Sequence, residues 1–268
     1  MTCAYGYPKC GHRHYHDTSK GETDMALDIA FKKPTGVDIS EKGRSKDGQT
    51  LSLDQRLFMQ LLAFGGCRDV QPLIEVLEAH RIDGVLYENL NDPLGIGLLT
   101  ASTTPDHFLT TVRAMLQAEP FASLTPQPAF TMFGRTYAIG YENDLEEVLL
   151  KRPHRYLCNP AWPWAIWYPL RRSGAFEQLS SEEQRTVLME HGGIGRAYGR
   201  ADHAHDIRLA CHGLDQDDND FVVGLVGKDL YPLSAIVQRM RQTRQTSQYL
   251  RHIGPFFVGK AVWQSEVP

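Results

Sequence analysis

The sequence of 268 residues lacks the features that are typical of membrane-spanning, secreted, nucleic-acid-binding and disulfide-rich proteins. No apolar run is long enough to span a bilayer, and the N-terminal segment lacks the apolar core of a secretory signal, so we expect a cytoplasmic protein with no membrane partner. A net charge of -4 and the lack of a Lys/Arg-rich run argue against a nucleic-acid partner. The five cysteines are odd in number and scattered, which does not suggest a disulfide framework.

Residues 1–50 lack a sustained hydrophobic period and are rich in Gly, Lys, Asp, Ser and Thr, which predicts a flexible arm. This arm holds a group of soft-metal ligand types: Cys3, Cys10, His12, His14 and His16. Their spacing matches neither a standard zinc motif nor the C-x-x-C-H pattern of covalent haem attachment. A flexible arm, or one that binds metal adventitiously, is therefore the favoured interpretation.

From Leu57 onward the pattern becomes regular, and one order of elements occurs twice. Residues 51–150 and residues 151–268 each predict a strand, a helix, two strands, a helix and a strand. Two such βαββαβ units predict an α+β protein of two tandem ferredoxin-like halves. Packing the two sheets on each other as a closed or nearly closed dimeric α+β barrel would cover both sheet faces, and it would leave a roomy apolar interior suited to a cofactor.

One helix in the second half carries the clearest indication of a site. Ser180 and Glu183 have the spacing of a capping box, and the pair Gly192 and Gly193 predicts that the helix ends directly after His191. A histidine in a last helical turn faces carbonyl groups whose partial negative charge favours a polarised or cation-bound ring. Taken alone, this pattern is compatible with ordinary helix capping and with an iron ligand.

The motifs of the second half, taken together, resemble a family of haem proteins. They are YPLRR from Tyr168, LSSEEQRTVLMEHGGIGRAYG from Leu179, G-L-D-x-x-D-x-D-F from Gly213 and MRQTRQTSQYLRHIGPFFVGK from Met240. In this combination they are similar to the chlorite dismutase and coproheme decarboxylase family, over about residues 57–263. The resemblance implies an iron porphyrin, either haem b or iron coproporphyrin III, and a ring of identical subunits, commonly five.

The resemblance also implies roles for individual residues. His191 takes the place of the proximal iron ligand, and Tyr168 takes the place of a tyrosine that is oxidised beside a reactive propionate. Arg172 stands where the decarboxylases have a propionate-facing lysine, and it keeps the positive charge with a different geometry. Arg155 is the nearest match to an arginine that contacts a propionate in the decarboxylases. Arg241 and Thr246 stand where the late helix of the family offers polar contacts to propionates, and the alternative for these two is a solvated helix face.

The opposite side of the iron is where the sequence departs from the family. Asp206 aligns with the distal arginine or glutamine, whereas Arg208 lies two residues on and therefore on the same strand face. A short insertion at 202–205 leaves both residues, and His205, as candidates. The strand at 221–226 also lacks the glutamate that hydrogen-bonds the proximal histidine in chlorite dismutases.

The favoured function is therefore that of a coproheme decarboxylase, which would use hydrogen peroxide to convert coproheme propionates to vinyl groups and yield haem b. One alternative is a haem peroxidase or chlorite-decomposing enzyme that uses Arg208. Another is a haem-binding or haem-transfer protein without turnover. For the favoured function we expect iron coproporphyrin III to lie between the two sheets of the second half.

Overall fold

A computed structural model describes residues 36–266 of the chain. The residues from Ile39 onward form one compact unit. It includes an N-terminal hairpin of β1 (Glu41–Arg44) and β2 (Thr50–Leu53), so the predicted arm boundary at residue 50 falls inside ordered structure. Glu41 attaches this hairpin to the end of the first half, because its carboxylate accepts hydrogen bonds from the Arg135 side chain at 2.8 Å and from the Ala138 amide at 2.9 Å. The predicted Cys/His group at residues 3–16 lies outside the described residues.

The doubled order of elements is confirmed. The elements of the first half are β3 (Phe58–Gly65), α1 (Gln71–Ala79), β4 (Gly84–Asn89), β5 (Ile96–Ser102), the π-helix η1 (Phe108–Val112) running into α2 (Arg113–Leu116), η2 (Phe121–Ser123), β6 (Thr125–Pro126), η3 (Pro128–Phe130) and β7 (Met132–Arg135). The π-helix η4 (Glu147–Lys151) and α3 (Arg152–Leu157) link the halves. The elements of the second half are β8 (Trp164–Arg172), α4 (Gly174–Glu177), α5 (Ser181–Arg200), β9 (His205–Ala210), β10 (Phe221–Gly227), α6 (Leu230–Met240), α7 (Arg244–Tyr249), β11 (Leu250–Ile253) and β12 (Phe257–Gln264).

The sheets of the two halves join into a closed barrel. Their strands follow the order β10-β9-β7-β3-β5-β4-β12-β8, and β10 also pairs with β8, which closes the ring. The halves meet at two seams. One is the ladder between β12 and β4, and the other is the contact of β7 with β9, where Arg135 is paired with Ala210. The predicted barrel of tandem ferredoxin-like units is confirmed within one chain.

The barrel interior is packed with side chains, so the prediction of a roomy cavity between the sheets was wrong. Trp167, Tyr87 and Phe257 are fully buried there among aliphatic residues of both halves. The packing is close enough that a Cβ built on Gly224 would lie 2.4 Å from the Trp167 ring. Interiors of small barrels commonly fill in this way, because alternate side chains of every strand point inward.

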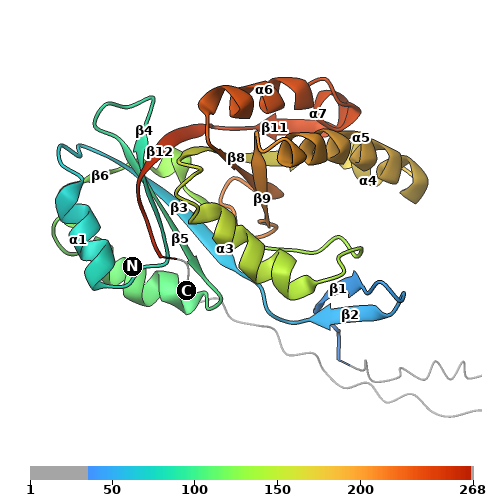
Figure 1. Cartoon of the computed structure of the whole chain (residues 1–268), viewed down its shortest axis with the longest axis horizontal. Helices are drawn as coiled ribbons and strands as arrows, with labels where there is room; N and C mark the ends of the chain where they lie inside the picture. The colour runs from blue at the N-terminus through green and yellow to red at the C-terminus, as the bar shows by residue number, and fades with distance from the viewer. Residues whose placement is uncertain (1–35, 267–268) are drawn as a thin grey trace, which may run out of the picture. The chain divides into compact units, whose positions relative to one another are not determined.

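Helices cover the outer faces of the sheet. In the first half, α1 and η1–α2 bury Leu73, Leu77 and Phe108 against the strands. In the second half, α5 and α6 pack over β8, β9 and β10, and Figure 1 shows α5, α6 and α7 gathered beside β8, β9 and β11. Within residues 36–266, no helix has the length and apolarity needed to cross a membrane.

Helix α5 begins as predicted, but it does not end as predicted. Ser180 and Glu183 form the expected reciprocal capping box. The helix then continues through Gly192 and Gly193 to Arg200 and stops where Asp202 takes a positive φ of 55°. A glycine inside a helix costs only about 1 kcal/mol relative to alanine, which packing of the helix on the sheet can outweigh. His191 therefore lies in mid-helix, and the expected contact with a helix C-terminus is absent.

Candidate functional site

The outer face of β8, β10 and β9 brings several predicted site residues into one row. Val223 of β10 is paired with Tyr168 of β8 on one side and with Arg208 of β9 on the other. Tyr168 and Arg208 are thus two strands apart, roughly 10 Å at the usual strand spacing. One row further along, Asp206 is paired with Leu225.

Side chains alternate between the two faces of β9, so the residues that were predicted for the distal side of the iron lie on different faces. Asp206 and Arg208 are on the outer face, whereas Ile207 is buried in the barrel interior. His205 also points inward, where its ring stacks on Trp162 at 3.6 Å and a ring nitrogen lies 2.8 Å from the Asp202 carboxylate. The outer site thus contains Asp206 and Arg208, and it does not contain His205.

His191 of α5 is held in one tautomer by a hydroxyl group. Its Nδ1 lies 3.2 Å from Oγ1 of Thr243, and that hydroxyl donates its hydrogen to the Met240 carbonyl at 2.7 Å. With its hydrogen on that carbonyl, Thr243 accepts from the ring, an arrangement that assigns the hydrogen to Nδ1 and leaves the lone pair on Nε2. Nε2 has no hydrogen-bond partner among the described residues. A neutral imidazole fixed in this way is the form that binds a metal ion.

Burial keeps the His191 ring neutral. Desolvation lowers its pKa to about 4, which Asp206 opposes and the positive charges of Arg208 and Arg172 reinforce. The ring is therefore uncharged at neutral pH. The same interactions show that His191, Asp206, Arg208 and Arg172 are within electrostatic reach of one another.

Tyr168 is almost completely buried on the same sheet face. Its ring stacks on Phe256 with centroids 4.7 Å apart. Burial raises the pKa of its phenol, the nearby Asp206 raises it further, and Arg241 partly offsets both. The phenol therefore stays protonated, and Arg241 at the end of α6 lies close enough to influence it.

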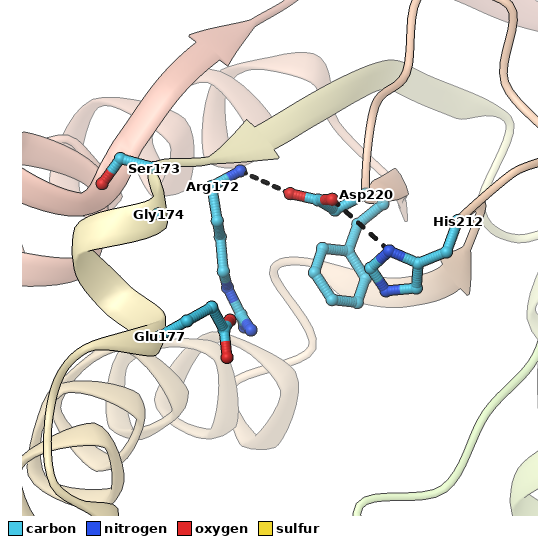
Figure 2. A pocket seen from close by; sticks show the side chains of 7 residues that line it. Arg172, Ser173, Gly174, Glu177, His212 and Asp220 are labelled. Atoms are coloured by element: carbon cyan, nitrogen blue, oxygen red, sulfur yellow. Dashed lines mark hydrogen bonds and ion pairs between the residues drawn. The ribbon is translucent and has the colours of Figure 1, made fainter.

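Arg172, the last residue of β8, lines an open cavity of about 440 Å³ (Figure 2). Its guanidinium lies between the rings of Phe176 and Phe221, at 4.5 and 4.7 Å from their centroids. Asp220 accepts a hydrogen bond from the Arg172 amide at 2.7 Å. In the described part of the chain the guanidinium makes no ion pair, its Nε is buried without a partner, and burial lowers its pKa. A carboxylate that reached this nitrogen would supply the missing acceptor.

Arg208 is already paired, unlike Arg172. Its Nε lies 3.0 Å from the Asp206 carboxylate, and both side chains are about half exposed. They line a smaller cavity of about 190 Å³ together with Tyr137 and Arg196. The Tyr137 ring lies 5.5 Å from that of Phe221, which lines the larger cavity, so a lining residue of one cavity contacts a lining residue of the other.

Two of the residues expected to contact propionates are placed differently from Arg172. Arg155 is exposed on α3, where it pairs with Glu147 at 2.6 Å and lines neither cavity. It belongs to a surface ion pair, because α3 turns this position away from the sheet. Thr246 lies in the first turn of α7, where its amide and hydroxyl are each 3.5 Å from Thr243 Oγ1.

Three residues at this site were not anticipated from the sequence: Thr243, Tyr137 and Arg196. Thr243 could have been noticed as a possible N-cap before the helix at 244–249, although no sequence pattern links it to His191. Tyr137 comes from the first half, and only barrel closure brings it to β9. Arg196 lies five residues after His191, a separation that says little about a shared site on a helix.

This geometry defines a class of protein: a single-chain α+β barrel that carries a histidine-bearing helix over the outer face of its second sheet. The chain belongs to the chlorite dismutase family, whose model matches residues 97–262. That match covers nearly all of the second half and the first half from β5 onward.

Two solved structures share the fold. One is a haem-binding protein from Thermus thermophilus, with 19% identity and a TM-score of 0.63 over 78% of this chain and 92% of that one. The other is chlorite dismutase from Candidatus Nitrospira defluvii in complex with imidazole, with 17% identity and a TM-score of 0.61 over 79% of this chain and 93% of that one.

A curated relative from Haloarcula marismortui, a haem-binding protein by name, is 27% identical over an alignment of 171 residues, and the match covers 60% of this chain. The matched part makes up 24% of the length of that relative, so the chain spans about a quarter of it.

Proposed function

We propose that the chain binds an iron porphyrin between α5 and the outer face of β8, β10 and β9, and that it is a haem-dependent oxidoreductase. The observation that carries this proposal is the His191 ring, which is neutral, held through Nδ1 by Thr243 and free at Nε2. In proteins, a histidine that binds metal characteristically donates its second ring hydrogen to a neighbouring acceptor. The family membership and the names of the relatives point to the same cofactor.

The residues around His191 fit an anionic macrocycle. Arg172 has a buried Nε that lacks an acceptor, and a propionate carboxylate would provide one. Arg196 and Arg208 add positive charge at the neighbouring cavity. Arg155 is left out of this assignment, because Glu147 already pairs with it on the surface.

Within this class, the reaction we favour is peroxide-dependent decarboxylation of iron coproporphyrin III to haem b. Bound iron would supply the oxidising chemistry with hydrogen peroxide. In each of two turnovers a propionate would lose carbon dioxide and two hydrogen atoms, leaving a vinyl group, and the peroxide would be reduced to two molecules of water. Tyr168 is our candidate for the residue that removes hydrogen from the propionate, because its phenol is buried, protonated and on the same sheet face as Arg208. Arg172 would hold a carboxylate, and Arg241 would lie near Tyr168.

A second reaction, peroxidase or chlorite-decomposing activity, is favoured by one observation. Arg208 is on the outer sheet face within electrostatic reach of His191, where a guanidinium could stabilise an anionic ligand. Its pairing with Asp206 at 3.0 Å already neutralises much of that charge. We therefore place this reaction second, with haem b as a resident cofactor rather than coproheme as a substrate.

The test is to titrate the purified protein with ferric coproheme and with haem b, add hydrogen peroxide and follow the porphyrin by mass spectrometry. Stepwise loss of two carboxyl groups from coproheme supports the decarboxylase. An unchanged porphyrin refutes it, and release of dioxygen from chlorite would support the second reaction instead. Stable porphyrin binding with no turnover of any of these substrates would identify a haem-binding or haem-transfer protein.

Two variants separate the roles at the site. His191→Ala should abolish the visible spectrum of the bound porphyrin, whereas His80→Ala, on the exposed end of α1, should leave it unchanged. Tyr168→Phe should keep binding and abolish decarboxylation. Tyr87→Phe is its matched control, because that phenol is also buried but lies inside the barrel. Decarboxylation by Tyr168→Phe at the wild-type rate would remove Tyr168 from the mechanism.

A further inference from the structure

A second group of reactive side chains lies outside the porphyrin site, around the end of helix α3. His154 lies in α3, and Cys158 is the C-cap residue four positions later, so both project from the same side of the helix end. Asp83, in the turn before β4, reaches them from the first half of the chain. Ser265, directly after β12, reaches them from its end.

The donor atoms of this group converge on one point. The Asp83 carboxylate lies 2.6 Å from Nε2 of His154, and Sγ of Cys158 lies 3.8 Å from the same nitrogen. Oγ of Ser265 lies 3.1 Å from the carboxylate and 3.3 Å from the sulfur. The candidate ligand atoms of Asp83, His154 and Cys158 all fall within 4.8 Å of one another.

The positions of these donor atoms distinguish a catalytic triad from a metal-binding site. In a nucleophile–histidine–carboxylate triad, the nucleophile and the acid contact opposite ring nitrogens, so that the imidazole can pass a proton between them. Here both Cys158 and Asp83 approach Nε2, which leaves no route through the ring. Three donors arranged around a common point are instead the arrangement that a metal ion requires.

The surrounding backbone holds these residues in place. The Cys158 amide closes the last turn of α3 by donating to the His154 carbonyl at 2.9 Å. Gly84 and Ser265 exchange hydrogen bonds, the Ser265 amide donating to the Gly84 carbonyl at 2.9 Å and the Gly84 amide to Oγ at 3.1 Å. Cys158 is buried, and the side chains of His154 and Asp83 are 12% and 38% exposed. A small ion could enter past the carboxylate.

We propose that Asp83, His154 and Cys158 form a divalent-metal site, with zinc as the favoured ion and Ser265 or a water molecule at the fourth position. A thiolate, an imidazole and a carboxylate are the donor types that zinc takes, at about 2.3, 2.0 and 2.0–2.2 Å in tetrahedral geometry. Those bond lengths place neighbouring donor atoms roughly 3.3–3.7 Å apart.

Two of the donor contacts would have to change to reach that geometry. The contact between Cys158 and His154 would shorten slightly from 3.8 Å. The contact between Asp83 and His154 would open from 2.6 Å, which the partly exposed carboxylate can accommodate by rotating. Binding would release the thiol proton and the proton shared between the imidazole and the carboxylate to solvent, and it would leave the oxidation state of the sulfur unchanged. The ion would join the turn before β4, helix α3 and the end of β12.

The test uses the full chain with Cys3→Ser and Cys10→Ser, because those thiols lie outside the described residues and would add their own signal. The protein is freed of metal with a chelator and titrated with Co²⁺, whose bond to a thiolate gives a charge-transfer band. We expect one equivalent of Co²⁺ to produce this band and Zn²⁺ to displace it. Cys158→Ala should lack the band, and Cys211→Ala, which removes another buried thiol, should retain it.

Asp83→Asn keeps the shape of the side chain and tests the site without disturbing a buried position. We expect it to weaken Zn²⁺ binding by more than about tenfold, as measured by competition with a chromophoric chelator. Zn²⁺ should also raise the melting temperature of the parent protein more than that of Asp83→Asn. Unchanged Zn²⁺ affinity in both Asp83→Asn and Cys158→Ala would overturn the proposal. Porphyrin binding should be the same in all these variants, so this outcome is independent of the function proposed above.

Discussion

Replacing Thr243 with valine removes the hydroxyl that fixes His191 and keeps the volume of the side chain. The interaction that this change removes is a hydrogen bond between neutral groups at 3.2 Å, and bonds of this kind contribute about 0.5–1.5 kcal/mol net. Because 1.4 kcal/mol corresponds to a factor of about ten, porphyrin affinity should fall by about two- to tenfold. Thr243 also caps α7 through a long contact to the Thr246 amide at 3.5 Å, so the protein should lose about 0.5–1 kcal/mol of stability as well.

The assay separates these two effects. Porphyrin affinity is measured by following the visible spectrum during titration of the apoprotein, and stability is measured by urea unfolding without porphyrin. Thr243→Ser keeps the hydroxyl and should restore both quantities. Ser180→Ala removes the capping box of α5, the helix that carries His191, and should reduce stability while leaving affinity unchanged.

One result would refute the reasoning. If Thr243→Val binds porphyrin with wild-type affinity and an unchanged spectrum, the hydroxyl does not determine which ring nitrogen carries the hydrogen. The proposed ligand assignment would then lose its main structural support.

Thr243→Asp should keep the helix cap and place a carboxylate against the imidazole, which strengthens electron donation from His191 to bound iron. A spectroelectrochemical titration should therefore show a lower reduction potential of the iron than in the wild type. An equal or higher reduction potential would contradict this prediction. Gly224→Ala should destabilise the protein by about 1–3 kcal/mol in urea unfolding, because its Cβ would lie 2.4 Å from the Trp167 ring, and an unchanged midpoint would show that the barrel interior can expand. The Arg155 guanidinium lowers the pKa of the Glu147 carboxyl through their hydrogen bond, so this pair stabilises the protein above the normal carboxyl pKa and loses its effect as the pH falls through the lowered value. Because the pair is largely exposed, Glu147→Gln should lower the free energy of unfolding by only about 0.3–0.5 kcal/mol at neutral pH and should not change it in strong acid. Arg155→Gln should not change porphyrin affinity. A measurable loss of affinity would place Arg155 at the porphyrin site.

The order of the strands and helices could be predicted from the sequence, because amphipathic periods and turn residues are local properties. The capping box at Ser180 and Glu183 was predicted for the same reason. The end of α5 was not, since the glycine pair weakens the helix by an amount smaller than the packing energy of its apolar face. The filled barrel interior also escaped prediction, because it depends on how side chains from eight strands of the ring meet.

The residues of the candidate site also divide into those that a local sequence pattern predicts and those that only the folded arrangement brings together. Alternation along β9 predicted that Asp206 and Arg208 share a face, and they do. The contact of His191 with Thr243 joins residues 52 positions apart, and Tyr137 reaches Phe221 only across a barrel seam. A local pattern carries no information about such pairs, since they arise from the arrangement of whole elements.

Closure of the ring affects any attempt to work with half of the molecule. A fragment of residues 151–268 would contain His191, Tyr168 and Arg208, but it would lack β4 and β7, the strands that pair with β12 and β9 at the seams. Its backbone amides and carbonyls at those two edges would be unpaired and exposed, a condition that promotes association of strands between molecules. Each half therefore needs the edge strands of the other half to complete its backbone hydrogen bonds, although only the second half carries His191.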